Sequence, residues 1–373
     1  MLLAQRRRRP NTPLYLSLKD DFLLMGTVKG FRIFSLFPTP NLLSIQESKD
    51  DTQQLEQDQD HSPNSVIYLP GGISALDVFE SSNLMVLVAG GKYPKFDPGK
   101  VLVWDDATCQ VLLEIQFSSP VKSAFLRSIN TRKDVGLLVV FLNTKVIIYQ
   151  LSLPKCKKLY EFDMYWNEYS AFGMSDSSAP SIILAFPARR KGQLQIVDIT
   201  NLPSIPITII CSGHDNMISS IAISRLGDYV ATCSTKGTLI RVWHSKSGTL
   251  RHELRRGSEE ADIFSMAFDP LVERLCVASD SGTVHFFNLE LEEDKKVSIV
   301  SSYLPKYFSS EWSFSYCSMP YLTRCILRFQ ELDVATSVYN IVQIVCDDGS
   351  IYKIAFDPVK GGECSVIANY NLY

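Results

Sequence analysis

Two adjacent arginines, Arg255 and Arg256, are the residues of this chain with the most specific chemistry. They end a segment of alternating apolar and polar residues, and Ser258, Glu259 and Glu260 follow shortly after. If the segment is a β-strand, consecutive side chains point to opposite faces, so one guanidinium would reach each of two neighbouring crevices. The planar guanidinium fork is suited to phosphate. The pair therefore predicts two anion sites served by one strand, and the alternative is a solvated arginine pair at a strand end.

The composition limits the class of protein. Hydrophobic residues make up 46% of the 373-residue chain and charged residues 21%, which is typical of a soluble protein with a sizeable core. Residues 46–60 hold six acidic residues and one lysine, a net charge of −5, whereas the whole chain carries −3, so the rest carries +2. That mildly basic remainder suits an anionic partner, and nothing in it points to nucleic acid.

The cysteines and the N-terminus indicate the compartment. Nine cysteines, an odd number, have no C-x-x-C spacing, and Cys233, Cys276 and Cys346 lie in apolar strand-like runs. They indicate buried hydrophobic residues in a reducing compartment. The apolar start of the chain is too short for a signal peptide, and no stretch approaches the ~20 apolar residues of a membrane span. We expect a cytosolic protein, and any contact with a membrane would be made from the surface. The run Arg6–Arg9 is a disordered basic terminus, an anionic-lipid contact or a nuclear-import patch.

Strand-like segments dominate the chain, and they repeat. Similar segments recur at a spacing of about 45 to 49 residues, the period of four-stranded propeller blades; they begin at Ile73, Val121, Tyr169, Ile218 and Ile263. Within a unit, a glycine-containing turn leads into a strand that ends in an aromatic residue, as from Gly237 to Trp243 and from Gly282 to Phe287. We predict an all-β fold, a seven-bladed WD40-like β-propeller with four-stranded antiparallel blades, forming one domain over residues 1–373.

The first and last blades complete this prediction. The first takes in residues 22–37 and Val66–Leu69, and the last begins near Cys325. We expect the strand Leu14–Leu18 to pair beside Ser365–Asn369, because that pairing would close the ring and remove exposed edges. Residues 46–65 are acidic and glutamine-rich, which predicts a disordered loop in blade 1.

Four segments from blades 5 and 6 carry a family resemblance. They are residues 231–243 (ATCSTKGTLIRVW), the Arg-Arg-Gly motif at 255–257, residues 279–285 (SDSGTVH) and residues 304–314 (LPKYFSSEWSF). In this order the chain resembles, over essentially its whole length, the PROPPINs, the phosphoinositide-binding propellers of autophagy that include the animal WIPI proteins. It departs from them at Leu254, where phenylalanine is usual, and at Ser281, where lysine is common. The second departure removes a cation from one of the two sites.

The resemblance implies two sites for phosphatidylinositol 3-phosphate and phosphatidylinositol 3,5-bisphosphate, one on each side of the Arg-Arg strand. Site 1 would consist of His214, Ser234, Lys236, Thr238, Arg241 and Arg255. Site 2 would consist of Arg256, Ser279, Ser281, Thr283 and His285. Hydroxyl groups donate to phosphate oxygens, arginine supplies a fixed charge, and we expect each histidine to become a second cation at mildly acidic pH.

Structural roles are the alternatives at these positions. His214 follows Gly213 as at the start of a generic WD40 blade, where the histidine stabilises a turn within a hydrogen-bond network. Ser234 and Thr238 flank a tight turn and could be turn residues. Thr283 and His285 are two residues apart and share one strand face, although a buried histidine that only stabilises the fold fits as well.

The family also implies a membrane-facing loop in blade 6, here residues 290–305. Its apolar residues would insert into the bilayer, and they are Val297, Ile299, Val300, Tyr303 and Leu304. Pro305 prevents a continuous helix through the segment. Beyond it, Tyr307, Phe308, Trp312 and Phe314 are predicted to be core residues of the outer strand.

No H-E-x-x-H, G-x-S-x-G or P-loop motif and no metal-ligand cluster occurs in the sequence, so we expect neither an enzyme nor a cofactor. The resemblance implies a monomeric phosphoinositide effector that scaffolds autophagosome formation at the phagophore assembly site, endosome and vacuole. It also implies a lipid-transfer partner that docks near blades 2 and 3, where Lys92–Phe96 is an expected exposed loop. The alternative is a WD40-type protein scaffold that does not bind lipid.

Overall fold

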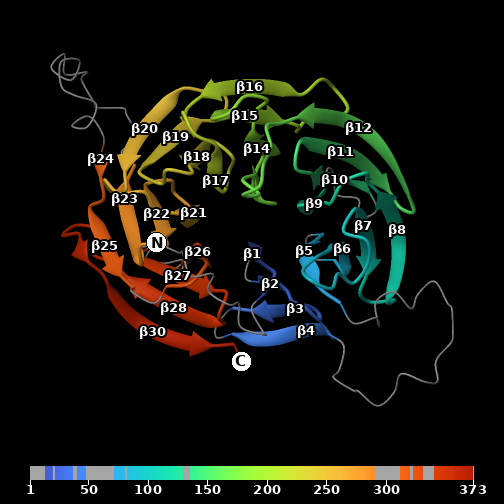
Figure 1. Cartoon of the computed structure of the whole chain (residues 1–373), viewed down its shortest axis with the longest axis horizontal. Coiled ribbons are helices and arrows are strands. Elements are labelled where there is room, and N and C mark those ends of the chain that lie inside the picture. Colours follow the sequence, from blue (N-terminus) through green and yellow to red (C-terminus); the bar gives the residue numbers. More distant parts are fainter. Residues whose placement is uncertain are drawn as a thin grey trace. The chain divides into compact units, whose positions relative to one another are not determined.

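The computed structural model describes residues 13–19, 22–36, 40–47, 71–79, 82–128, 135–289, 311–319, 322–330 and 340–372. Within these ranges every regular element is a β-strand, and the strands form seven sheets. The chain divides into two compact units: Met1–Phe162 with Asp347–Gly349, and Asp163–Cys346 with Ser350–Tyr373. We call each sheet a blade and number the blades 1 to 7 in chain order. Within each unit the strands follow one another from blade to blade in sequence order (Figure 1).

Blades 1 to 3 belong to the first unit. Blade 1 consists of β1 (Tyr15–Lys19), β2 (Phe22–Gly26), β3 (Gly30–Ser35) and β4 (Asn41–Glu47). Blade 2 consists of β5 (Ile73–Val78), β6 (Leu84–Ala89), β7 (Lys100–Asp105) and β8 (Gln110–Gln116). Blade 3 consists of β9 (Ser123–Ser128), β10 (Val135–Phe141), β11 (Lys145–Ser152) and β12 (Lys155–Asp163).

Blades 4 to 7 belong to the second unit. Blade 4 consists of β13 (Gly173–Met174), β14 (Ile183–Pro187), β15 (Gln193–Asp198) and β16 (Ile207–Ser212). Blade 5 consists of β17 (Ile218–Ile223), β18 (Tyr229–Ser234), β19 (Leu239–His244) and β20 (Leu250–Arg255). Blade 6 consists of β21 (Ile263–Phe268), β22 (Arg274–Ser279), β23 (Thr283–Asn288) and β25 (Ser315–Ser318). Blade 7 consists of β26 (Cys325–Gln330), β27 (Ile341–Cys346), β28 (Ser350–Ala355) and β30 (Ser365–Asn371).

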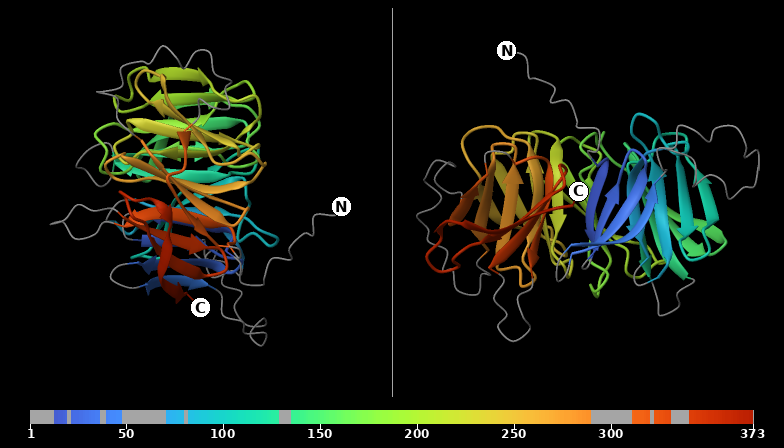
Figure 2. Two further views of the ribbon diagram at one scale, coloured as in Figure 1. Left: turned by 90° about the vertical axis from the view of Figure 1, so that its left-hand side faces the viewer. Right: turned by 90° about the horizontal axis from the view of Figure 1, so that it is seen from below.

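Seven four-stranded antiparallel blades make the fold a seven-bladed β-propeller, as the repeat predicts. The strands of each unit's blades run side by side in the two views of Figure 2. Blades 5 and 6 each gain one short parallel strand at their outer edge: β24 (Glu311–Trp312) pairs with β20, and β29 (Gly362–Glu363) pairs with β25. No helix in the described part of the chain is long and apolar enough to cross a membrane.

The second strand of a blade is buried almost throughout, because both of its faces meet apolar side chains. In β22 and β27, for example, five of the six residues are buried, and the corresponding sequences are nearly continuous apolar runs. Between blades 5 and 6, Leu254 and Ile240 pack with Val277 and Leu275 in one core cluster. Leu254 is 0% exposed, so this buried leucine fixes the end of β20 next to the two arginines.

Three blades share the same local irregularity in their inner strand. The inner strands of blades 2, 5 and 6 each have a register shift after their first residue, at Ile73, Ile218 and Ile263. A β-bulge adds one residue and bends the strand. These are three of the positions at which the sequence repeat begins.

One expectation about the first and last blades is wrong, and two others fall wholly or partly outside the described residues. β1 pairs with β2 inside blade 1, and β30 pairs with β28 inside blade 7, so Leu14–Leu18 does not pair beside Ser365–Asn369. The reason is that each of these blades draws four strands from its own continuous segment. The fourth strand of blade 1 is β4, and Val66–Leu69 lies outside the described residues. The predicted loop 46–65 also lies outside them, except that residues 46 and 47 end β4.

Candidate anion-binding site

The turn that joins β18 to β19 supports the candidate site. Gly237 has a φ of +65°, a conformation that favours glycine. A Cβ atom at this position would lie 1.7 Å from the carbonyl oxygen of Ala261. The turn is therefore packed directly against the segment that leads into blade 6. It presents Ser234, which is buried, Lys236, which is exposed, and Thr238, which is half-buried.

Arg256 is fixed by this turn. Its backbone N–H donates to the Thr238 carbonyl at 3.0 Å, and its Nε donates to the Gly237 carbonyl at 2.7 Å. Nη2 donates to the Glu259 carbonyl, and Nη1 donates to Ser281 Oγ at 3.4 Å. The residue is only 7% exposed, and burial lowers its pKa. A cation held this rigidly is prepared to accept an anion with little further loss of side-chain entropy.

The four other residues of site 2 form one chain of hydrogen bonds. Ser279 Oγ and Ser281 Oγ are 2.8 Å apart, as are Ser281 Oγ and Thr283 Oγ1. Thr283 Oγ1 lies 3.0 Å from His285 Nε2, and His285 Nδ1 lies 3.1 Å from Ser313 Oγ. Alternation along β23 places Thr283 and His285 on one face, as the spacing predicts. The hydroxyl groups can reorient, so a phosphate oxygen could replace a neighbour in this chain.

Of the predicted site 1 residues, His214 and Arg241 are in contact with each other. His214 Nε2 lies 2.9 Å from Thr232 Oγ1, which also accepts a hydrogen bond from Trp243 Nε1 at 3.0 Å. His214 Nδ1 lies 3.2 Å from Arg241 Nη1, and Arg241 Nη1 also donates to the Gly213 carbonyl. His214 therefore lies in a hydrogen-bond network of the kind that the WD40 alternative describes.

Arg241 forms an ion pair with Glu253. Its Nε donates to Glu253 Oε2 at 2.9 Å, and its Nη2 lies 2.7 Å from the same oxygen. Glu253 is on β20, directly opposite Arg241 in the register of β19 and β20. The charge of Arg241 is therefore offset by Glu253 before any ligand arrives. Arg255, two residues after Glu253 and half-buried, ends the same strand.

Both histidines resist protonation, which corrects the expectation that they become cations at mildly acidic pH. Burial lowers the pKa of His214 to about 4, and the nearby charge of Arg241 acts in the same direction. Burial lowers the pKa of His285 to about 4 as well, with a contribution from Arg256. Near pH 6 both rings are neutral, because removing an imidazolium from water is costly and an arginine lies close to each.

The segment after residue 310 lies between the two sites. Glu311 and Trp312 pair in parallel with Leu254 and Arg255, and Figure 1 shows β24 beside β20. The prediction that Trp312 is a core residue is wrong, because it is 52% exposed on this edge. Phe314 does pack against the core of blades 6 and 7. Tyr307, Phe308, the loop 290–305 and its five insertion residues lie outside the described residues.

Sequence reasoning missed Thr232, Glu253 and Ser313. Thr232 lies in the quoted segment 231–243, next to an apolar run, and Glu253 precedes the Arg-Arg pair by two residues. Their strand positions could have suggested them, because cross-strand neighbours face each other. Ser313 contacts a residue 28 positions earlier, and no local pattern in the sequence indicates that contact.

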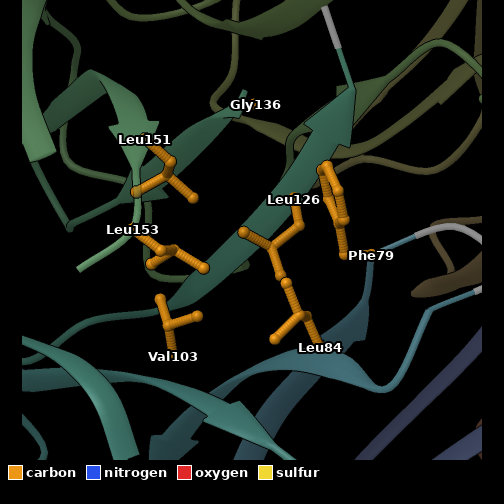
Figure 3. Close-up of a pocket in the computed structure, with 7 residues that line it drawn as sticks. All are labelled: Phe79, Leu84, Val103, Leu126, Gly136, Leu151 and Leu153. Carbon is orange, nitrogen blue, oxygen red and sulfur yellow. The ribbon is translucent and has the colours of Figure 1, made fainter. Parts of the chain in front are cut away.

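A separate cavity lies in the first unit. Figure 3 shows its lining, which is entirely apolar: Phe79, Leu84, Val103, Leu126, Gly136, Leu151 and Leu153. These side chains have no group that would bind phosphate.

The loop Lys92–Phe96 is in the same unit. Tyr93 is 71% exposed, with Lys92 Nζ 5.2 Å from its ring centroid, whereas Lys95 is buried and Phe96 packs against the core. Only the first part of the loop is therefore exposed.

The cysteines and the potential metal ligands of the described residues complete the description. None of the nine cysteines, which all lie in the described residues, forms a disulfide bond, and Cys233, Cys276 and Cys346 are buried, as predicted. Burial raises the pKa of the Cys233 thiol to about 12. Among the described residues, no group of three or more His, Cys, Asp or Glu side chains could hold a metal ion.

A β-propeller with a rigid arginine and a chain of hydroxyl groups on neighbouring blades has the features of a ligand-binding propeller. The PROPPIN family model matches residues 58–373. The chain therefore belongs to the PROPPIN family.

Individual relatives agree with this assignment. Autophagy-related protein 18e of Arabidopsis thaliana is 28% identical over 347 residues, which cover 91% of this chain and 82% of that protein. A solved structure of Kluyveromyces lactis Hsv2 with its complete loop 6CD has a TM-score of 0.72 at 18% identity, covering 97% of this chain and 100% of that one. A solved complex of KlAtg21 with the coiled-coil of AgAtg16 gives a TM-score of 0.65 at 17% identity, covering 97% and 100%. At these identities the structural likeness shows the fold alone.

Proposed function

We propose that the protein is a non-enzymatic phosphoinositide effector that binds phosphatidylinositol 3-phosphate and phosphatidylinositol 3,5-bisphosphate through sites 1 and 2. The observation that carries the proposal is the position of Arg256. Its guanidinium is fixed by two backbone carbonyls and donates to Ser281, a member of the hydroxyl chain that ends at His285. Fixed donors that converge from two blades suit a phosphomonoester on an inositol ring.

Two sites on adjacent blades would act together. Once one headgroup is bound, the second is presented at a high effective concentration, so two weak sites give useful avidity. Recruitment would then be reversible, and the protein would act as a peripheral scaffold in autophagosome formation on phagophore, endosome and vacuole membranes. Because both histidines are neutral near pH 6, the positive charge of the two sites would come from the arginines and Lys236, with the hydroxyl groups as further donors.

Liposome flotation tests the proposal. We compare the wild type with Arg255→Thr/Arg256→Thr and with Arg255→Thr alone, on vesicles with and without phosphatidylinositol 3-phosphate. The single variant is needed because Arg256 also holds the turn at Gly237, so the double variant can weaken the fold. Arg251→Thr is the matched control, since Arg251 is an exposed arginine of the same strand. Circular dichroism and thermal melting show which variants are folded.

We expect lipid-dependent flotation of the wild type and of Arg251→Thr. Flotation should be strongly reduced in folded Arg255→Thr and lost in the double variant. It should also weaken as salt rises from about 50 to 300 mM, because phosphate contacts are screened. Equal flotation of all variants, or none of the wild type, would contradict the two-site proposal.

A protein scaffold without lipid binding is the second candidate function. The specific observation in its favour is that Arg256 donates to two backbone carbonyls and that His214 lies in a network with Thr232 and Trp243. Both arrangements stabilise a blade without any ligand. In that case the arginine variants would lose thermal stability, and no variant would bind lipid.

We further infer that protein partners dock on blades 2 and 3. The similar KlAtg21 chain is in a complex with a coiled-coil, and the exposed pair of Lys92 and Tyr93 is the contact that we assign to such a partner, a coiled coil or a lipid-transfer protein. An exposed tyrosine next to a lysine offers a large contact area together with a charge.

A further inference from the structure

The turn that joins β14 to β15 in blade 4 is strongly basic. It contains Arg189, Arg190 and Lys191, and all three residues are exposed. Arg189 Nη2 lies 2.6 Å from Asp163 Oδ2, so the charge of this arginine is offset by an acid. Within the described part of the chain, neither Arg190 nor Lys191 forms an ion pair. Lys191 Nζ donates to the neutral side chain of Asn216 at 3.4 Å. Two of the three positive charges are therefore available to a ligand.

This turn is the counterpart of the turns that carry predicted residues of sites 1 and 2. Its glycine, Gly192, has a φ of +74°, and the glycines of the equivalent turns in blades 5 and 6, Gly237 and Gly282, have φ values of +65° and +76°. A Cβ atom at Gly192 would lie 1.7 Å from the His214 carbonyl oxygen, just as one at Gly237 would lie 1.7 Å from that of Ala261. The turns of blades 4 and 5 are thus both packed against the connection that leads into the next blade.

The blade 4 turn is bonded directly to a residue of the proposed site 1. The backbone N–H of His214 donates to the Gly192 carbonyl at 3.0 Å, and that of Gly213 donates to the same oxygen at 3.4 Å. The connection also contains one acid, Asp215, which is exposed. Three positive charges of the turn, less the charges of Asp163 and Asp215, leave a net charge of +1 beside His214. An anion held at site 1 would therefore have further cations next to it.

We propose that the β14–β15 turn is an accessory anion site, at which Arg190 and Lys191 bind the phosphate of a second acidic lipid while site 1 holds a phosphoinositide. The proposal rests on the proposed function. Because the turn is bonded to site 1, a bilayer that presents a headgroup to site 1 brings neighbouring lipids to the turn. Exposed cations suit the diffuse charge of an acidic membrane surface, whereas one specific headgroup needs fixed donors such as those of Arg256. Each cation near such a surface strengthens binding about five-fold.

Vesicle titrations with and without phosphatidylserine test the accessory site. Both kinds of vesicle contain phosphatidylcholine and phosphatidylinositol 3-phosphate, and the full chain is used throughout. We compare the wild type with Arg190→Gln/Lys191→Gln, the turn variant, and with the matched control Lys246→Gln/Arg251→Gln. The control removes the same two kinds of charge from exposed positions at the opposite end of the blade 5 strands. Thermal melting shows that both variants are folded.

We expect phosphatidylserine to raise the affinity of the wild type and of the control by the same factor. The turn variant should match the wild type on vesicles without phosphatidylserine and bind about ten-fold more weakly than the wild type when it is present. That difference should shrink as the salt concentration rises, because exposed charges are screened. Soluble inositol 1,3-bisphosphate, measured by calorimetry, should bind the wild type and the turn variant equally, because it needs site 1 alone.

The outcomes separate the accessory site from the proposed function. An equal gain from phosphatidylserine in the wild type and the turn variant would overturn the accessory site and leave the proposed function standing. Weaker binding of the soluble headgroup by the turn variant would also overturn it, because the two cations would then belong to site 1 itself. If the wild type binds neither the vesicles nor the headgroup, the proposed function fails and the accessory site fails with it.

Discussion

At the residue scale, His214 and His285 give the protein a pH-dependent stability. The folded pKa of each is about 4, whereas an unfolded histidine titrates near 6.5. Between these values the unfolded chain binds more protons than the folded chain. The free energy of unfolding contributed by these groups is therefore fully present above about pH 6.5 and falls as the pH falls toward 4.

We expect the urea midpoint, followed by circular dichroism, to be lower at pH 5 than at pH 7. The variant His285→Gln should reduce that difference, because glutamine keeps hydrogen-bonding groups but does not titrate. A His285→Gln protein whose midpoint shifts with pH as much as that of the wild type would contradict a buried neutral His285.

At the element scale, the glycine of the β18–β19 turn and the glycine of the Arg-Arg-Gly motif should respond differently to the same substitution. Gly237→Ala places a Cβ 1.7 Å from the Ala261 carbonyl at a φ of +65°, which costs on the order of 1–3 kcal/mol in backbone strain before the clash is relieved. In Gly257→Ala, a Cβ would meet nothing within 4 Å. We expect only Gly237→Ala to lower the melting temperature and vesicle binding, although Gly257 belongs to the Arg-Arg-Gly motif. Loss of stability in Gly257→Ala alone would contradict this.

The contacts that could be predicted from the sequence are those between residues close to each other along the chain. The alternation along β23 places Thr283 beside His285, and the glycine turn before β19 follows from its sequence. By contrast, the contact of His252 with Glu311 joins residues 59 positions apart, and that of Ser313 with His285 crosses between strands in the same way. Trp312 looked like a core residue because aromatic residues in a strand usually are. Its exposure follows from the pairing of β24 with β20, which sequence periodicity does not encode.

At the scale of the whole molecule, lipid and protein partners should be separable, because sites 1 and 2 belong to the second unit and the loop with Tyr93 belongs to the first. Lys92→Ala/Tyr93→Ala should reduce capture of a coiled-coil partner and leave flotation on phosphatidylinositol 3-phosphate vesicles unchanged. Arg255→Thr should do the reverse. Both binding experiments use the full chain, and parallel losses of both activities in either variant would contradict separate surfaces.

The continuity of each blade in sequence has a consequence for the order in which the chain folds. Most blades pair strands that are neighbours along the chain, so each needs only short loop closures and can form as it leaves the ribosome. Blade 6 is different, because residues 289–314 separate β23 from its outer strand β25. Its last closure is entropically the more costly one. During refolding, pulsed hydrogen exchange should find the β19 amides protected before those of β25, so the contacts of residues 311–314 with blades 5 and 6 would be among the last to form.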